Sequence, residues 1–368
     1  MQEGGEPQGI EVASKRPLFG ASADELRAWI AEQGHKPYRA KQIQQWAFHR
    51  RAKTFADMTD VPLDLRKKLD AEWTLFATEL AYRGIADDGT DKLLLRCRDG
   101  RNIECVSMSD PPRRTVCIST QVGCGMGCVF CASGLKGVER NLTSAEIFDQ
   151  VLQAQSLLPP GESITHVVVM GMGESLANLD NLLVALDRFC SPEDGLGMSQ
   201  RRVTISTVGL PAKIRKLAGM DRQYHLAVSL HAPTEALRDE LVPVNEKVGL
   251  AAVMAAADEY FQITGRQVTY EYVLLGGVND RREHATALGK LLKGRKAHVN
   301  LIPYNTVAGL PFQRPEPDDV RRFVETVRRF GVAVTVRRTK GREIDAACGQ
   351  LRRRLEAPSE PVAIGSRP

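Results

Sequence analysis

The sequence predicts an α/β protein, a partial (β/α)6 barrel of the TIM type preceded by a small helical domain. Two observations support this fold. After Arg114, strand-like runs alternate with helical patterns, and such alternation favours a parallel sheet or partial barrel. Before that point, short amphipathic segments carry helical spacing, and 368 residues suffice for one large and one small domain.

The first helix is predicted to begin at a capping box formed by Ser22 and Glu25. Two further amphipathic helices follow around Trp46 and Leu65, and an Asp99-Gly100 turn predicts a hairpin. We therefore expect five segments: a disordered tail over 1–20, a helical domain over 21–90, a hairpin linker over 91–113, the barrel core over 114–354 and a second disordered tail over 355–368.

Runs rich in β-branched and aromatic residues mark the strands of the barrel. A second capping box, Thr143 and Glu146, predicts the start of a helix after the first of these strands. In βα folds the chemistry lies at the carboxyl ends of the strands. The predicted strands are 115–120, 164–170, 202–207, 225–230, 268–274, 299–303 and 332–336.

Composition limits the class of protein. Hydrophobic residues make up 43% of the chain and charged residues 26%, a balance typical of a soluble globular protein. No apolar run reaches the roughly 18 residues that span a bilayer, and the N-terminus lacks the apolar core of a secretion signal. We therefore expect a cytoplasmic protein with no membrane partner, and a monomer.

Positive charge is unevenly distributed along the chain. From residue 316 to 354 there are eleven Lys or Arg against six Asp or Glu, which gives +5 in that segment alone. Shorter basic clusters lie at 50–53 and 66–68. Any one cluster is compatible with a solvated surface, but together they favour a polyanionic partner such as a nucleic acid.

Three of the eight cysteines, Cys124, Cys128 and Cys131, crowd into one loop with the spacing C-x3-C-x2-C. Three thiolates can hold three irons of a cubane 4Fe–4S cluster. The fourth iron is then open to a small molecule, as an enzyme requires. Structural zinc is the alternative, but it takes four ligands, usually as two separated pairs. The spacing therefore predicts an iron–sulfur cluster.

Polar residues follow the ends of successive predicted strands. One such residue would more often be a cap or a turn residue. Because several are predicted at the same edge as the cysteine loop, they suggest one lined pocket for a cofactor. These candidate residues are Gly173, Glu174, Ser206, Ser229, Leu230, His231 and Asn305.

Two other cysteines stand out. Cys117 lies on the first barrel strand and by itself would more often be a small core residue. Cys348 lies among small residues in a predicted loop, which suits a reactive thiol. Cys97, Cys105 and Cys190 are most simply packing residues.

The cysteine loop after the first strand resembles that of the radical S-adenosylmethionine superfamily. Over about residues 20 to 354 the chain further resembles the RlmN/Cfr family of RNA adenosine methyltransferases. The resemblance is carried by Lys36 to Arg39, Gln121 to Cys124, Gly171 to Glu174, Ser229 to Pro233, Asn300 to Asn305 and Asp345 to Leu351.

The resemblance implies one 4Fe–4S cluster per chain and two S-adenosylmethionine molecules per turnover. It implies that Cys348 takes a methyl group from the first molecule and that a 5′-deoxyadenosyl radical from the second activates this methyl for addition to adenine. Cys117 then forms a transient disulfide with Cys348 and frees the product. Glu104 matches the general base, although from sequence alone it is more simply an exposed hairpin carboxylate.

The resemblance also implies the partners. The housekeeping branch methylates carbon 2 of an adenosine in 23S rRNA and in some tRNAs, and we expect this activity, with RNA engaged by the helical domain and an electron donor such as flavodoxin. Ser175, where that branch usually has Pro, leaves carbon-8 methylation of 23S rRNA open. A different radical enzyme of the superfamily and a non-enzymatic iron–sulfur RNA sensor are the remaining alternatives.

Overall fold

The computed structural model describes residues 15–351, and the chain divides into two compact units between Ala77 and Thr78. The predicted tail over 355–368 and the basic run at 352–354 lie outside the described residues.

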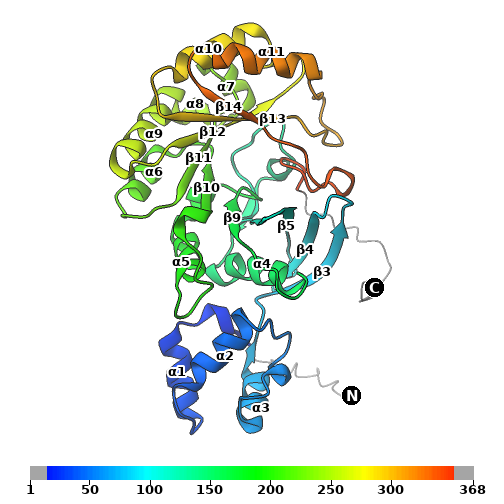
Figure 1. Cartoon of the computed structure of the whole chain (residues 1–368), viewed down its shortest axis with the longest axis vertical. Helices are drawn as coiled ribbons and strands as arrows, with labels where there is room; N and C mark the ends of the chain where they lie inside the picture. The colour runs from blue at the N-terminus through cyan, green and yellow to red at the C-terminus, as the bar shows by residue number, and fades with distance from the viewer. Residues whose placement is uncertain (1–14, 352–368) are drawn as a thin grey trace, which may run out of the picture. The chain divides into compact units, whose positions relative to one another are not determined.

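The first unit is helical, as predicted (Figure 1). Ser22 and Glu25 form the expected capping box at the start of its first helix. The rings of Trp29 and Trp73 meet edge to face in its core, with centroids 5.5 Å apart. Its elements are β1 (Arg16–Pro17), α1 (Ala23–Glu32), α2 (Arg39–Phe48), α3 (Leu63–Glu72) and β2 (Trp73–Thr74).

The prediction of a disordered tail over 1–20 is wrong for residues 15–20. Leu18 and Phe19 are buried, and the Phe19 ring lies 5.3 Å from that of Phe48. β1 also pairs in parallel with β2. Burial of this apolar pair fixes the segment in the helical unit, which the polar residues before it did not indicate.

The second unit is built on one ten-stranded sheet. The segment 78–85, predicted as part of the helical domain, is the first of its strands, so the unit begins at Thr78 and not after residue 90. The strands are β3 (Thr78–Ile85), β4 (Asp91–Cys97), β5 (Asn102–Asp110), β6 (Arg113–Cys117), β9 (His166–Val169), β10 (Val203–Thr207), β11 (His225–Ser229), β12 (Val268–Leu274), β13 (Ala297–Pro303) and β14 (Ala333–Val336).

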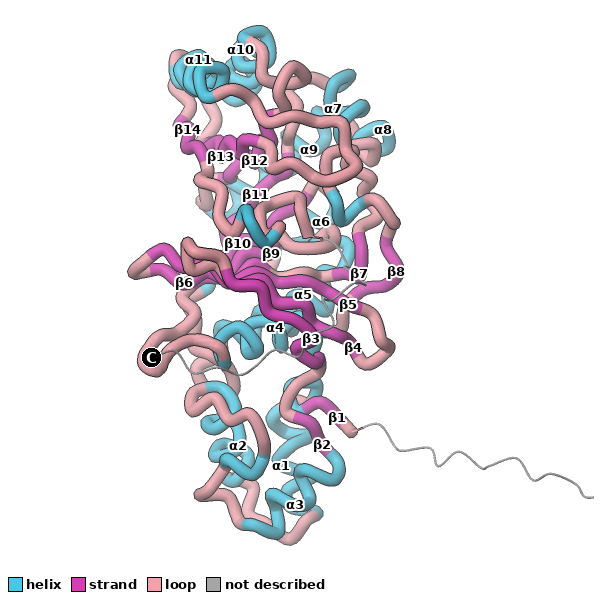
Figure 2. Tube along the Cα trace, turned by 90° about the vertical axis from the view of Figure 1, so that its right-hand side faces the viewer, coloured by secondary structure: helices cyan, strands magenta, loops and turns pink. Residues whose placement is uncertain are grey.

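The seven predicted barrel strands are all present and form the parallel part of this sheet. Their order is β14-β13-β12-β11-β10-β9-β6, and β6 is flanked on its other side by β5-β4-β3 in antiparallel pairing. Figure 2 shows these strands stacked along the unit. Parallel strands place their carboxyl ends at one edge of the sheet, where βα folds carry their sites.

The segment 91–113 is therefore not a linker. β4 and β5 form the hairpin predicted from Asp99-Gly100, but β5 continues the sheet by pairing with β6, with Val106 opposite Cys117. Leu93 and Leu95 on β4 are fully buried. The hairpin belongs to the same sheet as the barrel because its apolar residues face the shared core.

Helices connect the parallel strands and pack in pairs. α10 lies beside α11, α6 beside α9 and α4 beside α5 (Figure 1). α4 begins at the predicted capping box of Thr143 and Glu146. No helix within residues 15–351 is both long and apolar enough to cross a membrane. The helices are α4 (Ser144–Ser156), α5 (Leu179–Cys190), α6 (Pro211–Ala218), α7 (Glu235–Leu241), α8 (Asn245–Val248), α9 (Leu250–Thr264), α10 (Arg282–Leu292) and α11 (Pro317–Arg328).

Candidate active site

The three-cysteine loop is held at its base by a short antiparallel ribbon, β7 (Gln121–Gly123) and β8 (Val138–Asn141). Gly123 has a φ of +81°, and a Cβ atom there would lie 2.1 Å from the carbonyl oxygen of Gly137. Only glycine fits this position. The ribbon therefore closes tightly beneath the loop that carries Cys124, Cys128 and Cys131.

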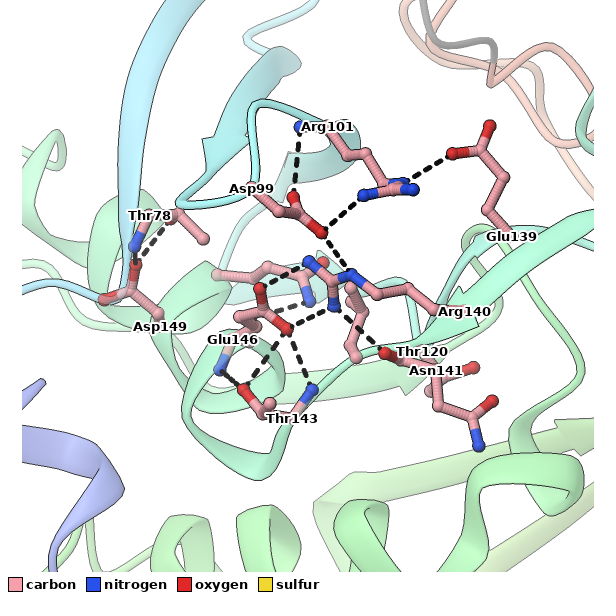
Figure 3. Close-up of polar contacts among 12 residues, drawn as sticks. Thr78, Asp99, Arg101, Thr120, Glu139, Arg140, Asn141, Thr143, Glu146 and Asp149 are labelled. Atoms are coloured by element: carbon pink, nitrogen blue, oxygen red, sulfur yellow. Dashed lines mark hydrogen bonds and ion pairs between the residues drawn. The ribbon is translucent and has the colours of Figure 1, made fainter. Parts of the chain in front are cut away.

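Arg140 on β8 anchors this ribbon to the rest of the unit (Figure 3). Its guanidinium donates to both carboxylate oxygens of Glu146 at 2.8 and 2.9 Å, and to Asp99 at 2.5 Å. The Arg140 hydrogen bond lowers the pKa of Asp99 to about 2. Arg140 thus ties the cysteine loop to the start of α4 and to the β4–β5 turn.

The three thiols line one cavity, called here the three-cysteine cavity. Burial raises the pKa of all three, to about 11 for Cys124. Metal binding must displace these protons. Within residues 15–351, no three Cys, His, Asp or Glu side chains converge on a single ion. Thiols spread around a cavity suit a cluster of separate irons, so the donor set fits a 4Fe–4S cluster.

Glu174 and Gly173 follow β9 and line the same cavity. The Glu174 carboxylate accepts from the backbone N–H groups of Leu176 at 3.0 Å and Val208 at 2.9 Å. Burial raises its pKa. Gly173 has a φ of +101°, and a Cβ atom there would lie 2.6 Å from the side chain of Gln121. The backbone thus fixes a buried carboxylate at the end of β9.

Ser206, Ser229 and His231 complete the wall of this cavity. The hydroxyl oxygens of Ser206 and Ser229 lie 3.3 Å apart. The His231 ring packs edge to face on Phe130 of the cysteine loop, and its Nδ1 accepts from the Val273 N–H at 3.1 Å. Its Nε2 therefore carries the proton. Leu230 is fully buried and does not line the cavity.

A second cavity, called here the two-thiol cavity, holds Cys117 and Cys348 together. Asn305 lines this second cavity and not the first. Its Nδ2 donates to the carbonyl of Cys348 at 3.3 Å, while its Oδ1 accepts from Thr339 at 3.0 Å. Asn305 thus supports the backbone of the Cys348 loop.

Cys348 lines both cavities, together with Cys131, Arg337 and Met170. The two cavities are therefore contiguous at this thiol. Cys117 is buried on β6, and burial, reinforced by the negative charge of Cys348, raises its pKa to about 12. All eight cysteines are free thiols in the structure, so it does not contain the disulfide predicted between Cys117 and Cys348.

The Cys348 loop is fixed on two sides. Towards the cysteine loop, the N–H of Ala132 donates to the carbonyl of Gly349 at 2.9 Å. Towards the hairpin, Gly341 donates to Asp88 at 3.0 Å and Lys92 donates to the carbonyl of Asp345 at 3.3 Å. The antiparallel extension therefore holds the segment that presents Cys348.

Glu104 is buried on β5, in contrast to the exposed position expected of a hairpin carboxylate. It forms an ion pair with Lys92 at 3.2 Å. Val106 and Met108, two and four residues further along β5, line the two-thiol cavity, and a period of two places them on the same face as Glu104. Glu104 itself does not line either cavity.

Sequence reasoning missed Arg337 and Glu271, which line the three-cysteine cavity. The Arg337 guanidinium lies 3.9 Å from the sulfur atoms of Met108 and Met170. The negative charges of Cys348, Glu271 and Cys117 raise its pKa. Two features of the sequence could have indicated them: Glu271 is a carboxylate inside the apolar run 268–274, and Arg337 directly follows β14. In the sequence, Arg337 stands out only as a member of a basic cluster.

Comparisons with known proteins agree with this geometry. A family model described as the ribosomal RNA large subunit methyltransferase N-terminal domain matches residues 17–75. The model of the radical SAM superfamily matches residues 118–288. The first match coincides with the helical unit and the second contains the three-cysteine loop.

Similar proteins cover nearly the whole chain. A Rhodopirellula baltica protein named probable dual-specificity RNA methyltransferase RlmN is 54% identical over 92% of this chain and 91% of its own. A Bacillus subtilis protein of the same name is 42% identical over 93% of this chain and 94% of its own. The crystal structure of a radical SAM methyltransferase from Sphaerobacter thermophilus matches with a TM-score of 0.88 at 42% identity, covering 92% of this chain and 99% of its own.

Proposed function

The chain belongs to the RlmN family of radical S-adenosylmethionine RNA methyltransferases, and on that premise we propose that it methylates carbon 2 of an adenosine in 23S rRNA. We further propose that it modifies an adenosine beside the anticodon of some tRNAs, since its relatives carry the name dual-specificity. The enzyme acts in the cytoplasm as a monomer, with an electron donor such as flavodoxin.

The observation that carries this proposal is the position of Cys348 at the junction of two cavities. One cavity holds the three cluster cysteines, and the other holds Cys117. A thiol that carries a methyl group has to face the source of the radical on one side and the resolving thiol on the other. Cys131 also lines both cavities, but its thiolate is taken up as a ligand of the cluster, which leaves Cys348 as the carrier.

Cys124, Cys128 and Cys131 hold the 4Fe–4S cluster, which supplies the electron that cleaves S-adenosylmethionine. The buried Glu174 carboxylate receives the ammonium group of that molecule, and Gly173 allows its backbone to approach. Ser206, Ser229 and His231 line the remaining wall, with two hydroxyls and the Nε2–H as hydrogen-bonding groups. Leu230 adjoins this wall only in sequence, since its carbonyl accepts from Arg238 and its side chain is outside the cavity, and Asn305 acts from the two-thiol cavity.

Cys348 is the nucleophile that takes the methyl group by displacement. Asn305 and Ala132 hold its loop, so the sulfur stays directed into the cavities. Arg337 lines both cavities, as Cys348 does, and its charge opposes the burial that raises the pKa of Cys117. The adenine adds to the carbon carried by Cys348, which leaves protein and RNA joined through one carbon.

Glu104 takes the ring proton of the adduct, whose unpaired electron would return to the cluster. The Cys117 thiolate then attacks the sulfur of Cys348: the S–S bond of the transient disulfide forms, the bond from that sulfur to the transferred carbon breaks, and this carbon takes up a proton to give the methylated base. Val106 and Met108, two and four residues beyond Glu104 on β5, line the two-thiol cavity. Lys92 contacts both Glu104 and the Cys348 loop. One side chain therefore links the proposed base to the loop that carries the methyl group.

Carbon 8 of the same ribosomal adenosine is the second candidate target. Ser175 is buried in the wall of the three-cysteine cavity, and its hydroxyl donates to the carbonyl of Val169 at 3.2 Å. A serine here replaces the proline usual in the carbon-2 branch. Its hydroxyl is committed to the end of β9, which favours a supporting role over contact with the base, and hence carbon 2.

The first unit engages the RNA. Arg39 stacks on Tyr38, which is 54% exposed, and Arg50 stacks on Trp46. Exposed aromatic and basic side chains in one small unit suit contacts with phosphates and unpaired bases.

Nucleoside analysis of RNA tests the proposal. Total rRNA and tRNA from cells with the gene, without it, and with a Cys348→Ala copy are digested and separated by mass spectrometry. We expect 2-methyladenosine only with the intact gene. Loss of 8-methyladenosine on deletion would move the enzyme to the other branch, and no change in either nucleoside would refute RNA adenosine methylation.

A further inference from the structure

Arg238 is a fully buried cation in the middle of α7. Its guanidinium donates to the carbonyls of Leu230 at 3.1 Å and Ser229 at 3.3 Å, and to the carbonyl of Val208 and Oδ1 of Asn245. All four acceptors are neutral oxygens. Within residues 15–351, no carboxylate lies within 4.0 Å of the guanidinium. Burial of an unpaired charge is costly, so its anionic partner has to be sought elsewhere.

The Asn245 amide links Arg238 to two acids. Asn245 accepts from Arg238 through Oδ1, while its Nδ2 donates to Glu235 at 3.0 Å and to Asp239 at 2.6 Å. Burial lowers the pKa of Arg238, and the thiolate form of Cys128, with Glu235 and Asp239, offsets part of this fall.

The packing also connects α7 with the cysteine loop. Val129, next to Cys128, donates its N–H to the carbonyl of Leu241 at the end of α7, at 3.2 Å. Cys128 also packs in one apolar cluster with Leu237 and Val244, which flank Arg238 and Asn245. α7 therefore lies against the part of the loop that carries Cys128.

We propose that Arg238 is a positioning residue that raises the reduction potential of the cluster held by Cys124, Cys128 and Cys131. The inference rests on the proposed function, since it requires the cluster. Three thiolates make the bound cluster an anion, and the electron that an external one-electron donor adds makes it more negative, with no bond formed or broken. A buried cation beside Cys128 stabilises the reduced form more than the oxidised form.

A redox titration of the full-length protein, reconstituted anaerobically and free of S-adenosylmethionine, tests this. The reduced cluster is followed by electron paramagnetic resonance. For Arg238→Met we expect the ratio of reduced to oxidised cluster at the wild-type midpoint to fall at least tenfold, which is 59 mV for a one-electron couple. Arg238→Lys retains the charge and should stay near the wild-type midpoint.

Lys247→Met is the matched control, because it removes the same charge from an exposed side chain on α8. It should leave the midpoint unchanged. Asn245→Asp provides a second route should Arg238→Met fail to fold. It places a carboxylate against the guanidinium without removing it, and it should lower the midpoint in the same direction.

The outcomes are distinguishable. A wild-type protein that binds no iron refutes the proposed function itself. An intact cluster with an unchanged midpoint in Arg238→Met or Asn245→Asp overturns the inference. Equal shifts in Arg238→Met and Arg238→Lys also overturn it, because the hydrogen bonds to the strand ends, and not the charge, would then determine the potential.

Discussion

Glu104 and Lys92 form a buried ion pair beside the two-thiol cavity. Replacing Glu104 with Gln keeps the shape and removes the base, so turnover should fall about a hundred- to ten-thousandfold. Methylation of Cys348 precedes proton removal and should persist. Single-turnover RNA methylation and intact-protein mass spectrometry measure the two steps.

Glu79→Gln provides the control for this prediction. Glu79 is an exposed carboxylate on β3, 3.8 Å from Arg96, and its loss should change turnover by less than about twofold. Wild-type turnover in Glu104→Gln would exclude Glu104 as the base.

His231 supplies a prediction about pH. Burial, aided by the nearby charge of Arg238, lowers the pKa of its ring to about 3. The folded ring stays neutral while the unfolded chain takes up a proton below pH ~6.5, so stability is complete above that pH and is lost as the pH falls towards 3. The slope from this group is about 1.4 kcal/mol per pH unit.

Urea unfolding of the apo protein at pH 8, 7, 6 and 5 measures this slope. His231→Asn keeps an acceptor for the Val273 N–H and removes the titrating ring. Between pH 6 and 5 the wild type should lose more unfolding free energy than the variant. Parallel curves would show that the ring takes up a proton in the folded state.

For individual residues, motif spacing predicted which side chains the structure brings together. Cys124, Cys128, Cys131 and Glu174 meet in one cavity, and Cys117 meets Cys348 in the next. Arg337 and Glu271 were missed because their roles arise from packing between strands far apart in the sequence. A lone charge in a strand does not reveal which face of the sheet it occupies.

Among the elements, the β7–β8 ribbon depends on Arg140, whose partners Asp99 and Glu146 belong to two separate segments (Figure 3). Arg140→Met leaves Glu146 largely buried without its cation, so unfolding free energy should fall by about 2 kcal/mol. Iron retained after reconstitution should fall as well, because the ribbon closes the cysteine loop.

Arg101→Met is the comparison. Arg101 contacts Asp99 and Glu139 in the same network, but the side chains of Arg101 and Glu139 are 43% and 38% exposed. Its loss should change stability by no more than about 0.5 kcal/mol. Equal effects of the two substitutions, measured by urea unfolding, would argue against Arg140 as the anchor.

The parallel strands were predictable because each is a short apolar run between turn signals. The extension β3–β5 was not recognised as part of the sheet. The local sequence pattern indicates which of its segments are strands. It does not indicate that β5 pairs with β6, because strand pairing depends on contacts with residues outside the segment. The same limit applies to β1, whose partner β2 lies at the far end of the first unit.

On the scale of the whole molecule, the first unit is proposed to bind RNA and the second to hold the chemistry. Lys36 and Lys41 are exposed on the first unit. Replacing both with Glu should weaken RNA binding and reduce its salt dependence, by about 0.7 in log–log slope for each single-strand phosphate that the variant no longer neutralises. Cleavage of S-adenosylmethionine without RNA should be unchanged.

Lys290→Glu with Lys293→Glu makes the same charge change on and after α10 of the second unit. Filter binding at several salt concentrations compares the two pairs. An equal reduction in affinity would indicate a general charge effect and not a specific RNA surface on the first unit.

The division into a helical and a catalytic unit was predictable from composition and period, since amphipathic helices give way to βα repeats. The exact boundary was not, because 78–85 carries no signal that assigns it to the sheet. The target carbon could not be predicted from the sequence pattern, because Ser175 lines a cavity that several strands build together.

The central claim is that Cys348 carries the transferred carbon and Cys117 releases it. Cys117→Ala, incubated with S-adenosylmethionine, reductant and RNA, tests this most directly after digestion with nuclease and protease. The account predicts that mass spectrometry finds the Cys348 peptide joined to an adenosine through one carbon. Release of methylated adenosine by this variant, or an adduct on any other residue, would contradict it.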